Sequence, residues 1–145
     1  MFKKILVPTD GSAFSLSAAT TATQLARSQG AQVIGVYVID PFPYIGIGDA
    51  SAAGLQSYLA ESRSVAGQAL DALGKVCAAE GVPFAGDTIE RNVVYEGVIE
   101  TANAEGCDLI VMASHGRKGV KALILGSVAQ KVLTHARMPV LIVKG

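Results

Sequence analysis

The alternation of short apolar runs with segments of helical periodicity is the feature that most constrains the fold of this chain. The apolar runs predict five strands, at residues 4–7, 33–39, 83–90, 109–112 and 140–143. Helical spacing between them predicts four helices, at about residues 12–29, 55–80, 94–105 and 127–136. Strict alternation of this kind is typical of an open, mostly parallel α/β sheet. Right-handed crossovers then place all carboxyl ends of the strands at one edge, where such sheets bind ligands.

Length and composition limit the classes of partner. The 145 residues fit one domain, residues 1–145, with a single sizeable core. Half of the residues are hydrophobic, yet no apolar run approaches the length of a membrane span. The formal net charge is zero, and no basic stripe follows a nucleic-acid backbone. We therefore expect no membrane and no nucleic acid as a partner.

The start of the chain and its cysteines favour a cytoplasmic location. The first ten residues contain a basic pair but no adequate apolar region or cleavage signal, so they do not form a signal peptide. Cys77 and Cys107 are expected to be small core residues rather than a disulfide or a metal pair, which fits a reducing compartment. Neither His115 nor His135 has a second metal ligand at a recognisable spacing.

Two polar, glycine-containing loops follow the first and fourth apolar runs. The first is residues 8–12, Pro-Thr-Asp-Gly-Ser, where Asp10 or Ser12 could cap the next helix. The second begins with residues 113–116, Ala-Ser-His-Gly. Such loops are what one would expect if the first and fourth strands are neighbours that flank a ligand crevice, but the strand order itself cannot be read from the pattern. The longest irregular stretch, residues 40–54, is interpreted as a lid or contact surface, with a flexible linker as the alternative.

The segment from Asp108 to Ser127 predicts an anion site. Ser127 and Gln130 form a capping-box pair, which indicates that a helix begins at Ser127. Strand, tight loop and helix start would then present backbone N–H groups and the positive end of a helix dipole, a combination that most often binds phosphate. The alternative is that the glycines only turn the chain and Ser127 only caps. No P-loop motif occurs, and Gly46-x-Gly48 lacks the third glycine of a dinucleotide fingerprint.

Four sequence blocks together resemble the universal stress protein family over essentially the whole chain. They are KKILVPTDGS at 3–12, VYVID at 36–40, VMASHG at 111–116, and GSVAQKVL with MPVLIV at 126–143. The ATP-binding branch of that family carries Gly-x2-Gly-x9-Gly-[Ser/Thr]. Ala113, Gly116, Gly126 and Ser127 stand at those positions, with the spacing intact.

The resemblance implies a three-layer sandwich around a five-stranded parallel sheet of order 3-2-1-4-5, a Rossmann-like fold of the adenine nucleotide alpha hydrolase type. It also implies a homodimer that binds ATP, ADP or AMP, with or without Mg²⁺. Pairing of strand 140–143 with its copy would build the dimer and remove an apolar edge that otherwise invites aggregation.

Carried over by position, the resemblance implies which residues meet the nucleotide. Asp10 would hold the ribose hydroxyls beside Pro8 and Thr9, although Asp10 as a helix cap is the alternative. The backbone around Val38 would meet the adenine, with Met112 packing nearby. The phosphates would lie against Gly116, Gly126, Ser127 and Val128, and the loop would add Ala113, His115 and Arg117.

Two departures from the family pattern bear on that site. Ala113 replaces a glycine, which is harmless at negative φ and damaging at positive φ. Asn92 and Val94 stand where relatives often have Gly and Pro, and the left-handed region that Asn tolerates would accommodate the change. Lys118 and Lys121, with Arg117, could add charge near the phosphates or form a solvated basic loop.

Three functions remain open at this stage. The first is a nucleotide-binding regulatory protein of the stress response. The second is a slow ATP hydrolase with His115 as the base, although no acidic pair for a metal is evident. The third is a family member that binds no nucleotide and acts through its dimer surface. The retained Gly116, Gly126 and Ser127 argue against the third.

Overall fold

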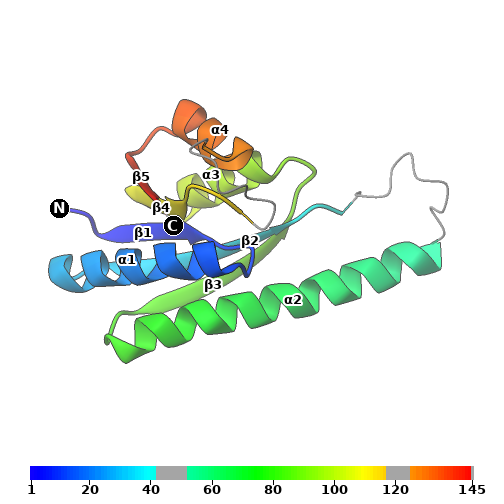
Figure 1. Ribbon diagram of the computed structural model, residues 1–145, viewed down its shortest axis with the longest axis horizontal. Coiled ribbons are helices and arrows are strands. Elements are labelled where there is room, and N and C mark those ends of the chain that lie inside the picture. The colour runs from blue at the N-terminus through cyan, green and yellow to red at the C-terminus, as the bar shows by residue number, and fades with distance from the viewer. Residues whose placement is uncertain (42–51, 117–124, 145) are drawn as a thin grey trace.

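Strands and helices alternate along the chain as the apolar pattern predicts, over the residues that the computed structural model describes (1–41, 52–116 and 125–144). Figure 1 shows their arrangement. In chain order they are β1 (Lys4–Pro8), α1 (Ala13–Gln29), β2 (Gln32–Ile39), α2 (Ala52–Ala79), β3 (Phe84–Glu90), α3 (Val94–Ala104), β4 (Leu109–Ala113), α4 (Ser127–His135) and β5 (Val140–Val143).

The strands form one parallel sheet in the order β3-β2-β1-β4-β5, which confirms the order implied by the family resemblance. β1 lies at the centre. It pairs with β2 from Lys4↔Gln32 to Pro8↔Val36, but with β4 only at Ile5↔Leu109 and Leu6↔Ile110. Beyond Leu6, β1 and β4 therefore separate, and a gap opens at the carboxyl edge of the sheet.

The central strands are covered by helices on both faces, so side chains on both faces are buried. This explains why these strands are apolar almost throughout. On one face α1 and α2 pack over Ile5, Val7 and Val33. On the other face α3 and α4 pack over Leu6 and Ile34. Figure 1 shows these two helical layers with the sheet between them. β3 is an edge strand, and each of its residues is either exposed or half-buried, as its weaker apolar pattern predicts.

The boundaries differ from the predicted ones in small ways. β1 includes Pro8, which was expected to stop it, and α2 begins at Ala52 rather than Leu55. The end of the predicted irregular stretch 40–54 is therefore helical, while residues 42–51 lie outside the described part of the chain. Of the two candidate caps for α1, Ser12 is the one used, because its side chain accepts from the Ser15 N–H.

Both cysteines are buried and free, as expected for core residues. Burial raises the pKa of the Cys107 thiol to about 11, even though the charge of Lys4 acts in the opposite direction. The Cys77 Sγ lies 3.4 Å from Thr23 Oγ1 in the core between α1 and α2. Within the described residues, no helix is both long and apolar enough to span a membrane.

Gly35 in β2 lets α2 approach the sheet closely. A Cβ atom at Gly35 would lie 2.6 Å from Leu73 Cδ2 and 2.9 Å from Phe84 Cε1. Leu73 is 1% exposed and cannot move away without disturbing the core.

We expect Gly35→Ala to lower the free energy of unfolding by about 1–3 kcal/mol, because the methyl group overpacks this contact. The matched control is Gly67→Ala, where a Cβ meets nothing within 4 Å on the surface of α2. That change should raise the free energy of unfolding by about 0.4–1 kcal/mol, because alanine restricts the unfolded chain. Urea denaturation measures both, and equal effects of the two substitutions would contradict the close approach.

Candidate functional site

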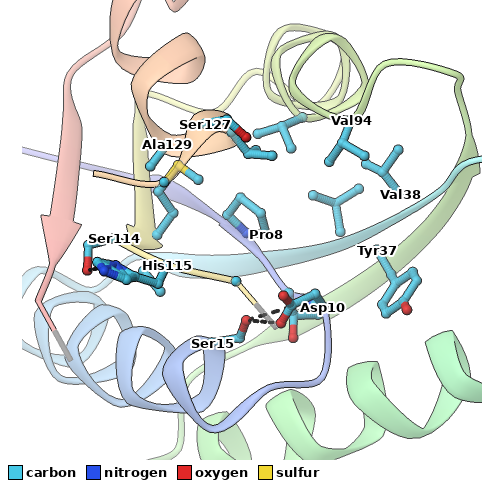
Figure 2. A pocket seen from close by; sticks show the side chains of 18 of the residues that line it. Pro8, Asp10, Ser15, Tyr37, Val38, Val94, Ser114, His115, Ser127 and Ala129 are labelled. Atoms are coloured by element: carbon cyan, nitrogen blue, oxygen red, sulfur yellow. Dashed lines mark hydrogen bonds between the residues drawn. The ribbon is translucent and has the colours of Figure 1, made fainter. Parts of the chain in front are cut away.

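A cavity of about 610 Å³ opens where β1 and β4 separate, below the start of α4. Figure 2 shows its lining side chains. The position is the switch point of the sheet, because the chain leaves β1 and β4 toward helices on opposite faces. Its lining consists of Pro8, Thr9, Asp10, Ser15, Val36, Tyr37, Val38, Val94, Val98, Met112, Ala113, Ser114, His115, Gly116, Leu125, Gly126, Ser127, Val128 and Ala129.

Every predicted site residue except Arg117 lines this cavity. The residues come from four places: the end of β1, the end of β2, the end of β4 with the loop after it, and the start of α4. Arg117, with Lys118 and Lys121, lies outside the described residues. The described residues that the family resemblance named therefore line one cavity, although they come from segments more than one hundred residues apart.

Asp10 is held at the start of α1 by two donors. Its Oδ1 accepts from the Ser12 N–H at 2.9 Å and from Ser15 Oγ at 2.7 Å. Asp10 is not the cap of α1, because that position belongs to Ser12. A Cβ at Gly116 would lie only 2.7 Å from Asp10 Oδ2, so glycine is what allows the loop after β4 to pass so close to the carboxylate.

The start of α4 differs from the prediction. Ser127 is the first helical residue, and Gly126 occupies the N-cap position without a side-chain hydrogen bond. The capping box between Ser127 and Gln130 is therefore wrong, because Ser127 lies one position too far into the helix. Without a capping side chain on Gly126, the first-turn N–H groups of α4 are available to an anion in the cavity.

The backbone joins the end of β4 directly to the start of α4. The Gly126 N–H donates to the Ser114 carbonyl at 2.8 Å. A Cβ at Gly126 would lie 2.9 Å from that same oxygen, so the contact needs a residue without a side chain. Gly126 has a φ of −59°, and its importance is therefore close approach rather than unusual backbone geometry.

Ala113 brings no backbone strain to the site. It is the last residue of β4, paired with Val143, and no described residue other than glycine has a positive φ. The same finding applies to Asn92, which does not adopt the left-handed region that was expected to accommodate it. Ala113 therefore has a negative φ, the case in which alanine in place of the motif glycine causes no backbone strain.

His115 lies in the loop after β4, directly before Gly116, and it contacts Ser114 and Phe14. Its Nδ1 is 3.0 Å from Ser114 Oγ, and its ring centroid is 6.0 Å from that of Phe14 in α1. Among the described residues, no group of three or more His, Cys, Asp and Glu side chains could hold a metal ion.

The backbone of Val38 faces the cavity from β2. The carbonyl of Val36 points toward β1, where it accepts from the Thr9 N–H at 2.9 Å, and the carbonyl of Ile39 points toward β3, where it accepts from the Arg91 N–H. Because strand residues alternate in direction, the Val38 N–H and C=O point toward β1. β1 has its last pair at Pro8↔Val36, so these two groups lie beyond it, beside the cavity.

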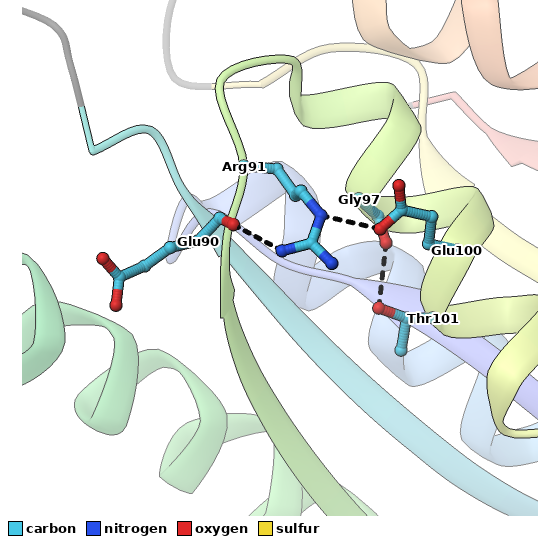
Figure 3. Close-up of polar contacts among 5 residues, drawn as sticks. All are labelled: Glu90, Arg91, Gly97, Glu100 and Thr101. Atoms are coloured by element: carbon cyan, nitrogen blue, oxygen red, sulfur yellow. Dashed lines mark hydrogen bonds and ion pairs between the residues drawn. The ribbon is translucent and has the colours of Figure 1, made fainter.

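Sequence reasoning missed the contribution of α3. The turn before α3 is fixed by Arg91, whose Nε lies 2.7 Å from Glu100 Oε2 and whose Nη1 donates to the Glu90 carbonyl at 2.7 Å (Figure 3). A Cβ at Gly97 would lie 3.0 Å from Val38, so α3 packs closely on β2. Val94 and Val98, one helical turn apart, thereby form an apolar wall. Also missed were Ser15, Val36, Tyr37, Ser114, Leu125 and Ala129.

Comparison with known proteins gives a consistent result. A family model described as the universal stress protein family matches residues 1–144. The chain is 37% identical over 145 residues to Universal stress protein MJ0531 of Methanocaldococcus jannaschii, in an alignment that covers 99% of this chain and 83% of the relative. It is similar in structure to the hypothetical protein MJ0577 of the same organism, with a TM-score of 0.86 at 27% identity, covering 100% of this chain and 97% of the other.

Two more distant solved structures share the fold and contain nucleotides. One is a universal stress protein in complex with cAMP, with a TM-score of 0.70 at 24% identity, covering 99% of this chain and 97% of the other. The second is the universal stress protein from Archaeoglobus fulgidus in complex with dAMP, with a TM-score of 0.66 at 20% identity, covering 97% and 96% of the two chains.

The different positions of Ser12 and Ser127 predict different effects on stability. Ser12→Ala should lower the free energy of unfolding by about 1 kcal/mol, because it removes the side-chain cap of α1. Ser127→Ala should change it by less than about 0.5 kcal/mol, because that hydroxyl caps nothing. Urea denaturation of both variants is the measurement, and a loss in Ser127→Ala as large as in Ser12→Ala would restore the capping box.

Proposed function

The chain belongs to the universal stress protein family, and we propose that it is a regulatory protein of the stress response that binds an adenine nucleotide in the cavity at the switch point. One observation carries the proposal: this cavity joins an exposed helix start, a fixed carboxylate and a pair of strand backbone groups. A helix start can bind a phosphate, a carboxylate can bind the ribose hydroxyls, and strand backbone groups can pair with the edge of a base.

The phosphates are proposed to lie against the start of α4. The N–H groups of Ser127 and Val128 belong to the first helical turn, where the helix dipole is positive. Gly116 and Gly126 keep this end of the cavity free of side chains. Mg²⁺, if bound, would be held mainly by the phosphates, which is how Mg²⁺ commonly binds with nucleotides.

The ribose is proposed to meet Asp10, with Pro8 and Thr9 beside it. A carboxylate accepts hydrogen bonds from both hydroxyls of a sugar diol, and charge-assisted bonds of this kind are stronger than neutral ones. The two donors to Oδ1 hold the Asp10 carboxylate in one orientation at the cavity wall.

The base is proposed to lie between Val38 and the apolar wall made by Val94, Val98 and Met112. The Val38 N–H and C=O match the ring N1 acceptor and the exocyclic amine donor of adenine. Guanine would place its exocyclic oxygen against the Val38 carbonyl, and two acceptors facing each other are unfavourable. The cAMP and dAMP complexes of distant family members support the choice of adenine.

The proposal predicts a preference for ATP over GTP. Isothermal titration of nucleotide-free protein should give at least about tenfold tighter binding of ATP, because one buried acceptor in the GTP complex would be left unpaired. Gly126→Val is the blocked-site control, since its side chain would occupy the space at the Ser114 carbonyl. Equal affinities for ATP and GTP, or undiminished binding in a folded Gly126→Val variant, would count against this site.

We also propose, as part of this function, that the chain forms a homodimer in the cytoplasm through β5, residues 140–143. β5 is an edge strand, and Leu141 is 39% exposed. The Pro139 carbonyl accepts from the Ile110 N–H in β4, and the Val143 carbonyl accepts from the Ser114 N–H just after β4. Because strand residues alternate in direction, the N–H and C=O groups of Val140 and Ile142 point away from β4, to the open edge of the sheet. An apolar strand with outward N–H and C=O groups can pair with a second copy of itself. The free, buried cysteines fit a reducing compartment.

The dimer is tested by replacing Ile142 with proline, which removes an outward N–H but no bond within the sheet. We expect sedimentation velocity to show a dimer for the wild-type chain and a folded monomer for Ile142→Pro. Leu141→Pro is the matched control, because its N–H faces β4, and its loss should instead destabilise the fold. A wild-type monomer at micromolar concentration would overturn the proposed dimer.

A further inference from the structure

Ser15 is a buried polar residue at the cavity that sequence reasoning did not identify. It lies in the first turn of α1, only 6% of its surface is exposed, and its hydroxyl faces Asp10 (Figure 2). That hydroxyl donates to Asp10 Oδ1 at 2.7 Å and accepts from the Asp10 N–H at 3.3 Å. Ser15 thus contacts both the side chain and the backbone of the same residue.

The hydrogen-bonding capacity of Ser15 indicates that it acts through Asp10. A serine hydroxyl has a single hydrogen to donate. In Ser15 that hydrogen is directed at the Asp10 carboxylate, so it is not available to a molecule in the cavity. The contact is a 2.7 Å hydrogen bond from a buried hydroxyl to a part-buried carboxylate, and hydrogen bonds to carboxylates are stronger than those between neutral groups.

Capping of α1 does not account for the Ser15 hydroxyl. The cap bond runs from the Ser15 backbone N–H to Ser12 Oγ at 3.2 Å, and it does not use the Ser15 side chain. The two hydroxyls lie 3.2 Å apart, but only the Ser15 hydroxyl contacts the carboxylate, because Ser12 reaches Asp10 Oδ1 through its backbone N–H. Ser12→Ala therefore removes the helix cap and keeps both donors to Oδ1.

We propose that Ser15 is a positioning residue, which fixes the Asp10 carboxylate for ribose and so sets a preference for ribose over a sugar without the diol. The inference rests on the proposed nucleotide function. Asp10 Oδ2 lies against the backbone of Gly116, where a Cβ would be 2.7 Å away. The Ser15 hydroxyl and the Ser12 N–H hold Oδ1, and the loop that carries Gly116 lies close to Oδ2, so the carboxylate has one orientation toward the cavity.

The experiment compares ATP with 2′,3′-dideoxyATP, which retains the base and the phosphates but lacks the diol. Isothermal titration gives the ratio of the two dissociation constants for the wild-type chain, Ser15→Ala and Ser12→Ala. We expect Ser15→Ala to reduce the preference for ATP by about tenfold, the factor that corresponds to one charge-assisted hydrogen bond. Ser12→Ala should melt at a lower temperature and keep the wild-type ratio.

Each further outcome has a definite meaning. If Ser15→Ala weakens both ligands by the same factor, or leaves the ratio unchanged, the inference is overturned while the proposed function stands. If the wild-type chain binds neither ligand, both are overturned. Should Ser15→Ala fail to fold, Ser15→Cys keeps a group at the γ position, larger than the hydroxyl, that donates only weakly. A reduced ratio in Ser15→Cys supports the inference, and a wild-type ratio overturns it.

Discussion

The length of β1 is the constraint on which the cavity depends. This central strand pairs with β4 at only two positions and stops at Pro8, while β2 continues to Ile39. A longer β1 would cover the Val38 backbone with a sheet partner, and a longer pairing with β4 would close the gap below α4. The cavity is therefore a space that the sheet leaves open, and the helices on either face only complete its walls.

Glycine acts at this cavity through size. Gly116 and Gly126 lie within contact distance of Asp10 Oδ2 and the Ser114 carbonyl, respectively, at positions where a side chain could not fit. Neither is among the glycines with positive φ, which end helices and turns elsewhere in the chain. Ala113 lines the same cavity with ordinary backbone geometry, so alanine at that motif position needs no strained conformation.

The strands and helices were predictable because apolar periodicity and capping residues are local signals. The strand order came only from the family resemblance, because periodicity does not reveal which strands are neighbours. The capping-box pattern misplaced the cap of α4 by one residue, since Gly126 and Ser127 are both acceptable caps and the choice depends on the backbone contact with Ser114. Ser15 was missed because a single buried hydroxyl in a helix has no periodic signature.

The Val38 backbone, which faces the cavity, has a consequence for how this protein could change through mutation. Groups of the main chain are the same for every residue type except proline, so a substitution at Val38 alters the shape of the wall but not the donor and acceptor that it offers. A scan of side-chain replacements would pass over this position. If the proposed base contact holds, a change of base preference would instead require an insertion or deletion that alters where β1 ends.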